Sequence, residues 1–253
     1  MGRRTALWRG ASRRGADDAE RPFWISFADL MTALMVLFLV VMAVALLAVT
    51  RTASEREERE ATHRSRIAAC VERAEAAAAR HPGVRIDRDR RVIDFGDRAR
   101  FAFGSSALAP EQESVLRRFV PELIALTEGG DCQTVLKRIV VEGYTDRTGD
   151  YLGNLQLSLL RSQRVLCALF KPGGPDALSD AQKRAVRDLF LVGGFAFNAG
   201  RETAEESRRV EMRIEFLGLD ESRVGAAAAA VNARGGEGVG VGIGETAFGR
   251  CAI

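Results

Sequence analysis

Residues 23–50, FWISFADLMTALMVLFLVVMAVALLAVT, constrain this chain more than any other stretch. Their one charged residue is Asp29, and the twenty residues from Leu30 to Val49 carry no charge. An α-helix rises about 1.5 Å per residue, so twenty residues cover about 30 Å, the hydrocarbon thickness of a bilayer. Residues 22–50 are therefore expected to form a transmembrane helix.

Positive charge is concentrated before this span, although the whole chain has a net charge of only +3 and no polyanion-binding signature. Residues 1–21 hold six arginines against three acids: Arg3, Arg4, Arg9, Arg13, Arg14 and Arg21 against Asp17, Asp18 and Glu20. Arginine-rich flanks stay in the cytoplasm. We expect a single-pass bacterial inner-membrane protein with a cytoplasmic tail, 1–21, and everything after the span in the periplasm.

A cleaved signal peptide is the alternative interpretation of the same segment. Signal peptides have an apolar region of about 7–15 residues and a small-residue cleavage site. ALLAVTRTAS matches such a site only weakly, and the span is longer and contains Asp29. The sequence therefore favours an uncleaved anchor.

The position of Asp29 within the expected span is energetically unfavourable. A carboxylate in hydrocarbon costs several kcal/mol, so it pairs, faces a wet cavity or takes up a proton. Thr32 adds a polar group one turn later, on roughly the same face. The alternative is an acid near the cytoplasmic interface whose side chain reaches the headgroups without further role.

The segment after the span, 51–83, is rich in Ala, Glu and Arg and is expected to form a helical stalk that Pro82 and Gly83 end. It is either a solvated spacer or a helix that pairs with its copy in a dimer. The tail, 220–253, is rich in Gly and Ala. Its glycines lack the flanking strand and helix of a phosphate loop.

Residues 84–219 alternate between strand and helix patterns. Strands are expected in a hairpin, VRIDRDRRVIDFGD, and in KRIVVEGY, LVGGFAF and RRVEMRIEF; helices in ALAPEQESVLRRFVPELIAL, LGNLQLSLLRSQRVLCALF and DAQKRAVRDLF. In the second helix, five residues should face the core: Leu155, Leu159, Val165, Leu166 and Leu169. The expected fold is an α/β domain with one mixed sheet and helices packed on one side.

The four cysteines are not spaced as close pairs, and with only two histidines a zinc or other metal site is not expected. An even number of cysteines in an oxidising compartment suggests disulfides. Cys132 with Cys167 is the favoured pair, which leaves Cys70 with Cys251. Four free buried thiols are the alternative.

The span, FWISFADLMTALMVLFLVV, resembles the transmembrane helix of MotB-type stator subunits: an aromatic residue, Ala-Asp, Met-Thr-Ala, then apolar residues. In that family the matching acid carries the ion. The resemblance therefore implies that Asp29 is the ion-translocating carboxylate, with H⁺ as the expected ion and Na⁺ as the alternative.

A second motif, VEGYTDRTGDYLGNLQLSLLRSQRV, resembles the signature of OmpA-like peptidoglycan-binding domains. The matching positions are Gly143, Tyr144, Thr145, Asp146, Gly149, Asn154, Leu157, Ser158 and Arg161. FAFGSSALAPEQESVLRRF resembles the entry to the family's first helix, and ESRRVEMRIEF its closing strand. The resemblance covers about residues 92–217 and, in addition, the span.

Peptidoglycan stems contain a diamino acid with both an ammonium and a carboxylate. By the resemblance, Asp146 takes the ammonium, Arg161 grips the carboxylate in bidentate fashion, and Asn154 and Leu157 line the same pocket. Taken alone, Asp146 would be a turn cap and Arg161 a solvated helix residue. Two departures bear on wall affinity: Tyr144 stands where the family has His, and VGGFAFNAGRET differs from the family's glycine-rich third loop.

Flagellar MotB proteins have a longer linker with a plug helix, whereas here only residues 51–83 separate the span from the domain. This architecture looks more like the ZorB family of the Zorya anti-phage systems. The resemblance implies a homodimer held to peptidoglycan inside a ring of a MotA-like partner, ZorA, as a rotary motor. It implies neither a cofactor nor nucleic-acid binding.

Two alternatives are a flagellar stator subunit and a passive wall-anchoring protein. An enzyme is not expected, because the sequence has no paired carboxylates, nucleophile triad or metal-ligand cluster.

Overall fold

The computed structural model describes residues 17–221 and Cys251, with side chains from Phe27 onward. The chain divides into two compact units, Met1–Glu58 and Arg59–Ile253. The expected tail of residues 1–21 lies mostly outside the described residues, and so does the tail 220–253 except for its first residues and Cys251.

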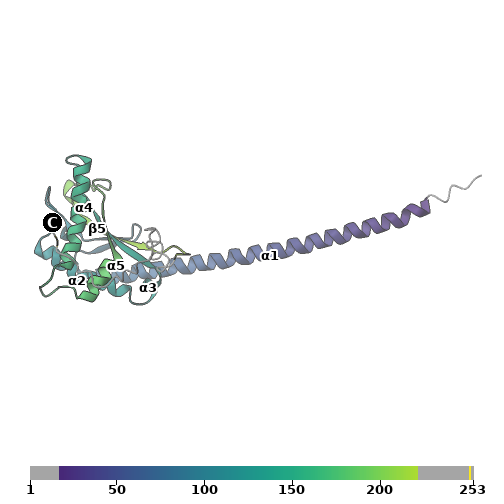
Figure 1. Cartoon of the computed structure of the whole chain (residues 1–253), viewed down its shortest axis with the longest axis horizontal. Coiled ribbons are helices and arrows are strands. Elements are labelled where there is room, and N and C mark those ends of the chain that lie inside the picture. The colour runs from purple at the N-terminus through teal and green to yellow at the C-terminus, as the bar shows by residue number, and fades with distance from the viewer. Residues whose placement is uncertain (1–16, 222–250, 252–253) are drawn as a thin grey trace, which may run out of the picture. The chain divides into compact units, whose positions relative to one another are not determined.

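Helix α1, Asp17–Ala78, contains the expected span and runs on past it without a break (Figure 1). By length and composition it is able to cross a membrane: its most apolar window has a mean hydropathy of 3.0, and among the described residues none of that window is buried. A helix that is apolar all round and unpacked is suited to lipid rather than water. Within it, the Thr32 hydroxyl donates to the Ala28 carbonyl.

The second unit alternates strands and helices as the sequence predicts. Its strands are β1 Arg85–Asp87, β2 Val92–Asp94, β3 Leu136–Gly143, β4 Phe190–Gly194 and β5 Val210–Phe216. Its longer helices are α2 Pro110–Leu126, α4 Tyr151–Phe170 and α5 Asp180–Leu189. Three short turns of helix were not expected from the sequence: η1 Gly96–Ala99, α3 Asp131–Val135 and α6 Ala204–Ser207.

The five strands form one mixed sheet in the order β1-β2-β5-β3-β4. Strands β3 and β4 are parallel, whereas β5 runs antiparallel to both of its neighbours, β3 and β2. The expected hairpin β1–β2 is present, and Arg91 in its turn has a positive φ of 54°. The ends of β2, β3 and β4 and the starts of β1 and β5 therefore lie at one end of the sheet.

The two faces of the sheet differ in chemistry. Ile139, Val141, Met212 and Ile214 belong to the hydrophobic core, which they share with residues of α2, α4 and α5. The residues between them point the other way because side chains alternate along a strand. On that second face Glu142 lies directly opposite Glu211, and both are nearly inaccessible to solvent. The expected fold class is confirmed, with a polar network on the uncovered face.

Helix α4 approaches the sheet unusually closely. A Cβ added to Gly143 would lie 1.9 Å from the Ser158 carbonyl oxygen, and one added to Gly194 would lie 2.7 Å from Ser158 Oγ. Small and polar side chains therefore occupy this stretch of the buried helix face: Asn154, Ser158, Arg161 and Ser162. The expectation that Leu159 faces the core is wrong for this reason, since its side chain is exposed, whereas Val165 and Leu169 are buried.

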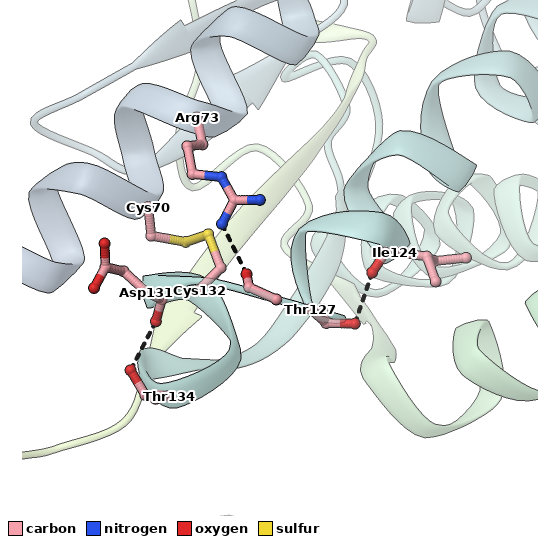
Figure 2. The surroundings of a disulfide bond; sticks show 8 residues. Cys70, Arg73, Ile124, Thr127, Asp131, Cys132 and Thr134 are labelled. Carbon is pink, nitrogen blue, oxygen red and sulfur yellow. Dashed lines mark hydrogen bonds between the residues drawn. A yellow bond between two sulfur atoms is a disulfide. The ribbon is translucent and has the colours of Figure 1, made fainter.

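The last turns of α1 belong to the folded domain and are not a solvated stalk. Cys70, Ala74, Ala77 and Ala78 lie in its hydrophobic core. Polar contacts hold the same turns in place. Arg73 Nη1 donates to the Gly129 carbonyl at 2.7 Å (Figure 2), and His63 Nε2 lies 3.0 Å from the Leu217 carbonyl. The domain therefore begins within α1, well before residue 84.

All four cysteines are paired, but not as the sequence suggested. Cys70 in α1 is bonded to Cys132 in α3 (Figure 2), and Cys167 in α4 to Cys251. The favoured pair Cys132–Cys167 is wrong. The physical reason is the packing of α1 into the core, which brings Cys70 to α3, where Cys132 is fully enclosed.

Candidate functional site

Asp146 follows the end of β3 and is held in a fixed orientation. Its Oδ1 accepts from the Thr148 backbone N–H at 2.9 Å and its Oδ2 from Arg208 Nη1 at 3.1 Å. Burial raises the pKa of this carboxyl, but the hydrogen bonds from Thr148 and Arg208 outweigh burial and lower the pKa below its ordinary value. Asp146 is therefore an ionised carboxylate at neutral pH.

Arg161 reaches the same region from α4, but its guanidinium is fully buried. Its three nitrogens donate to backbone carbonyls of Ser105, Tyr144 and Ala102, at 2.9, 2.6 and 3.2 Å. Its Cζ lies 5.0 Å from the centre of the Phe101 ring. Burial lowers the pKa of Arg161 to about 10, and the Asp146 carboxylate opposes this shift. The side chain is thus a buried cation that joins α4 to two loops.

Asn154 is also buried and fixes the turn before it. Its side-chain nitrogen donates to the carbonyls of Thr148 and Asp150, at 2.8 and 3.0 Å. The Asp150 side chain caps the start of α4 by accepting from the Gly153 N–H. Leu157 is half-buried on the same helix. Asp146, Asn154 and Arg161 thus meet at the loop after β3: Asn154 bonds the Thr148 carbonyl, and Arg161 bonds the Tyr144 carbonyl.

Two neighbours of Asp146 in sequence have unequal roles. The Thr145 hydroxyl is buried and has no hydrogen-bond partner among the described residues. Buried polar groups rarely lack a partner, so such an atom marks a place where a ligand or water belongs. Tyr144 instead turns its side chain to the network on the uncovered face, where its hydroxyl donates to Glu142 Oε2 at 2.7 Å. Only the carbonyl of Tyr144 contacts Arg161.

Arg208 was not singled out by the sequence, and it completes the site. Its Nε donates to the Phe101 carbonyl at 3.1 Å while its Nη1 bonds Asp146. The next residue, Arg209, points to the opposite face and donates to Glu211 at 2.7 Å. These two arginines lie between α6 and β5: Arg208 is the C-cap residue of α6, and Arg209 forms an isolated bridge with Arg100. Their side chains therefore reach different sites, although they are adjacent in the sequence.

In the first unit, Asp29 lies on the exposed surface of α1. It is the only charged residue between Pro22 and Thr50. Among the described residues, no group of three or more histidines, cysteines or acids is placed to hold a metal ion.

A known protein family matches part of each unit. The model of the OmpA family matches residues 100–199, and that of the membrane MotB of the proton-channel complex MotA/MotB matches residues 9–52. Neither is an enzyme family, in agreement with the sequence. The Zorya protein ZorB of Escherichia coli O139:H28 (strain E24377A / ETEC) is 41% identical over 217 residues, which are 85% of this chain and 88% of that protein. The chain belongs to the ZorB family.

Two solved structures are also similar to this ZorB-family chain. A MotB-like protein from Desulfovibrio vulgaris is 20% identical, with a TM-score of 0.37 over 61% of this chain and 99% of that one. The periplasmic domain of Helicobacter pylori MotB is 16% identical, with a TM-score of 0.37 over 61% of this chain and 92% of that one. The match to the OmpA family model includes the Asp146 loop and α4.

Proposed function

We propose that this chain is the wall-anchored subunit of an ion-driven rotary motor of the bacterial inner membrane. Its span crosses the membrane once, with the amino terminus in the cytoplasm and the second unit in the periplasm. The observation that carries the proposal is the ZorB relative, 41% identical along nearly the whole chain, together with the MotB match over the span. The same relative supports a role in Zorya anti-phage defence.

Asp29 is proposed to carry the ion, a proton. The support is its position as the one acid in an apolar helix. Burial of this carboxylate in lipid would be energetically costly unless it pairs with a partner subunit or faces a water-filled path. Each elementary charge that crosses the membrane potential releases about 2.3 kcal/mol per 100 mV, which is the energy available for movement. The partner would be a ring of a MotA-like subunit, ZorA, around the spans of two copies of this chain.

Peptidoglycan is proposed to bind at Asp146. Its ionised carboxylate would take the ammonium of the stem diamino acid, and the buried Arg161 would supply the matching cation. A guanidinium has five N–H donors, and three of those of Arg161 bond carbonyls. The other two have no hydrogen-bond partner among the described residues, and we propose that they bind the ligand carboxylate. The Thr145 hydroxyl, next to Asp146 in the chain and without a hydrogen-bond partner among the described residues, is proposed as a further donor.

The motor role is tested by Asp29→Asn, which keeps the size of the side chain and removes its titration. We expect normal membrane insertion and loss of both phage protection and proton flux through the co-reconstituted ring. Asp29→Glu, which retains a carboxyl group, is the matched control and should keep part of the flux. Full protection with Asp29→Asn would leave a passive wall anchor as the better description.

The anchor role is tested with Asp146→Asn in the full-length protein. We expect loss of co-sedimentation with isolated peptidoglycan sacculi and a cooperative unfolding transition that is retained. Asp176→Asn is the matched control: its carboxylate accepts from Ser114 on another part of the domain. Sedimentation of Asp146→Asn at the wild-type level would remove this residue from the wall contact.

A further inference from the structure

A second charged cavity lies beside the Asp146 site. It has a volume of about 750 Å³ and is lined by segments that precede β1, follow β2 and precede β5. Five arginines and four acids line it: Arg85, Arg98, Arg100, Arg201 and Arg209, with Asp94, Asp97, Glu202 and Glu206. Asp146 and Arg161 are not among these residues, so the cavity is separate from the motif site.

Two arginines of the lining, Arg201 and Arg209, are already paired with acids. Arg201 Nη2 donates to Glu211 Oε1 at 2.6 Å and to Asp94 Oδ2 at 3.1 Å. Arg209 Nε donates to the same Glu211 oxygen at 2.7 Å, and its guanidinium lies 4.4 Å from the centre of the Tyr144 ring. These groups shape the cavity, but their charges are already paired.

Three other residues of the lining have unpaired charges. Among residues 27–221 and Cys251, the guanidiniums of Arg85 and Arg98 and the carboxylate of Glu202 have no hydrogen bond or ion pair. Arg98 lies across Gly83, where an added Cβ would come within 3.0 Å of its Nε. The lining of the cavity therefore offers a ligand two unpaired cations, Arg85 and Arg98, and one unpaired anion, Glu202.

The two sites share one end of the sheet. Asp94 is the last residue of β2 and lies opposite Glu211 of β5. Arg85 starts β1 opposite Asp94, and Asp146 follows β3. The adjacent residues Arg208 and Arg209 separate the two sites: Arg208 bonds Asp146, and Arg209 lines the cavity. A polymer bound at Asp146 would pass this same end of the domain.

We propose that the Arg85–Arg98 cavity is a second peptidoglycan subsite, which binds a free carboxylate of a stem peptide next to the one held at Asp146. This inference rests on the proposed function. The two free guanidiniums suit a carboxylate, and Glu202 suits a nearby amine of the same peptide. Four acids in the lining disfavour a uniformly negative polymer, because such a chain would meet like charge.

The experiment compares full-length protein with Arg85→Ala/Arg98→Ala for binding to isolated sacculi. We expect the affinity to fall about tenfold, because two charge-assisted contacts are lost. Binding of a small diamino-acid peptide should not change, since it fills only the Asp146 site. Sacculi whose peptide carboxylates have been amidated should bind both proteins equally. Arg66→Ala/Arg184→Ala, which removes two exposed arginines elsewhere, is the matched control.

Three outcomes distinguish the possibilities. If Asp146→Asn abolishes binding and the Arg85/Arg98 variant equals its control, the second subsite is refuted while the proposed function stands. If Asp146→Asn binds normally, the proposed function fails at its own site. If glycerophosphoethanolamine competes for the Arg85/Arg98-dependent binding and amidation has no effect, the cavity binds a lipid headgroup and the proposal is overturned.

Discussion

At the scale of single residues, Glu211 shows how the uncovered face tolerates two buried carboxylates in register. Glu211 faces Glu142 across the ladder, yet guanidiniums surround both: Arg90, Arg201 and Arg209 bond Glu211, and Arg213 bonds Glu142. Burial alone raises the pKa of Glu211, but the hydrogen bonds from Arg209 and Arg201 outweigh it, and the pKa is lowered.

This lowered pKa gives a pH prediction. The stabilisation by Glu211 is complete above its ordinary pKa of about 4.3 and is lost as the pH falls through the lower, folded-state value. Glu211→Gln should reduce the free energy of unfolding at pH 7 by about 3 kcal/mol, with a difference that shrinks below about pH 4. Urea unfolding between pH 7 and pH 3 measures this, with the exposed Glu205→Gln as control. A constant difference across that range would contradict it.

Arg161 gives a second residue-scale prediction. A lysine carries a compact ammonium and cannot reach three carbonyls that are spread around a planar fork. Arg161→Lys should therefore destabilise the domain by about 2 kcal/mol, because buried carbonyls lose their partners. Chemical unfolding of the full-length protein in detergent measures the loss. An unchanged midpoint would show that Arg161 does not hold the loops together.

The sequence predicted Asp146 and Arg161 as a pair, because a long motif fixed their spacing. It did not predict that Arg161 would be enclosed by carbonyls of Ala102 and Ser105, since those contacts join segments far apart in the chain. Arg208 was missed for a related reason. The strand was expected to begin at Arg208, but β5 begins at Val210, and the direction of Arg208 is set by the end of α6, a short helix that the sequence did not predict.

At the scale of elements, the contact of α4 with the sheet depends on glycine. Gly143→Ala should destabilise the domain by about 3 kcal/mol or more, because the new methyl group would overlap the Ser158 carbonyl. This carbonyl belongs to the backbone, so it cannot rotate out of the way. Gly129→Ala is the matched control, since a Cβ there meets no atom within 4 Å. Thermal unfolding compares the two, and equal midpoints would refute the close approach.

The end of α1 is fastened by the bond between Cys70 and Cys132, which encloses a separation of 62 residues. By the loop-closure argument, Cys70→Ser/Cys132→Ser should lose about 4 kcal/mol of stability. Amide hydrogen exchange should rise most in residues 63–78. Cys167→Ser/Cys251→Ser should leave those amides unchanged and is the control. Equal exchange in the two variants would mean that packing alone holds the helix.

The helix itself was predictable, whereas its packing was not recognised. Cys70, Ala74, Ala77 and Ala78 recur at helical spacing, and this apolar stripe of small residues is the signal of a buried face. The Ala-, Glu- and Arg-rich composition of residues 51–83 hid the stripe. Had it been recognised, Cys70 would have been placed against the domain, and its pairing with Cys251 would have lost favour.

At the scale of the whole molecule, the two compact units should unfold separately. The first unit is an apolar helix with its own internal hydrogen bonds, which lipid or detergent stabilises. The second has a hydrophobic core of its own. On heating in detergent, near-ultraviolet circular dichroism should report one transition, and a helical far-ultraviolet signal from the span should remain. Reductant should lower the midpoint of that transition. Simultaneous loss of both signals would show that the units unfold as one.

The bond between Cys167 and Cys251 makes the carboxyl-terminal part of the chain a covalent ring. A protease that cuts once between residues 222 and 250 would open the ring without releasing a fragment. The nicked protein would keep its full mass on a non-reducing gel and would separate into two pieces only after reduction. A single cut in this segment would thus leave the second unit covalently joined through the disulfide.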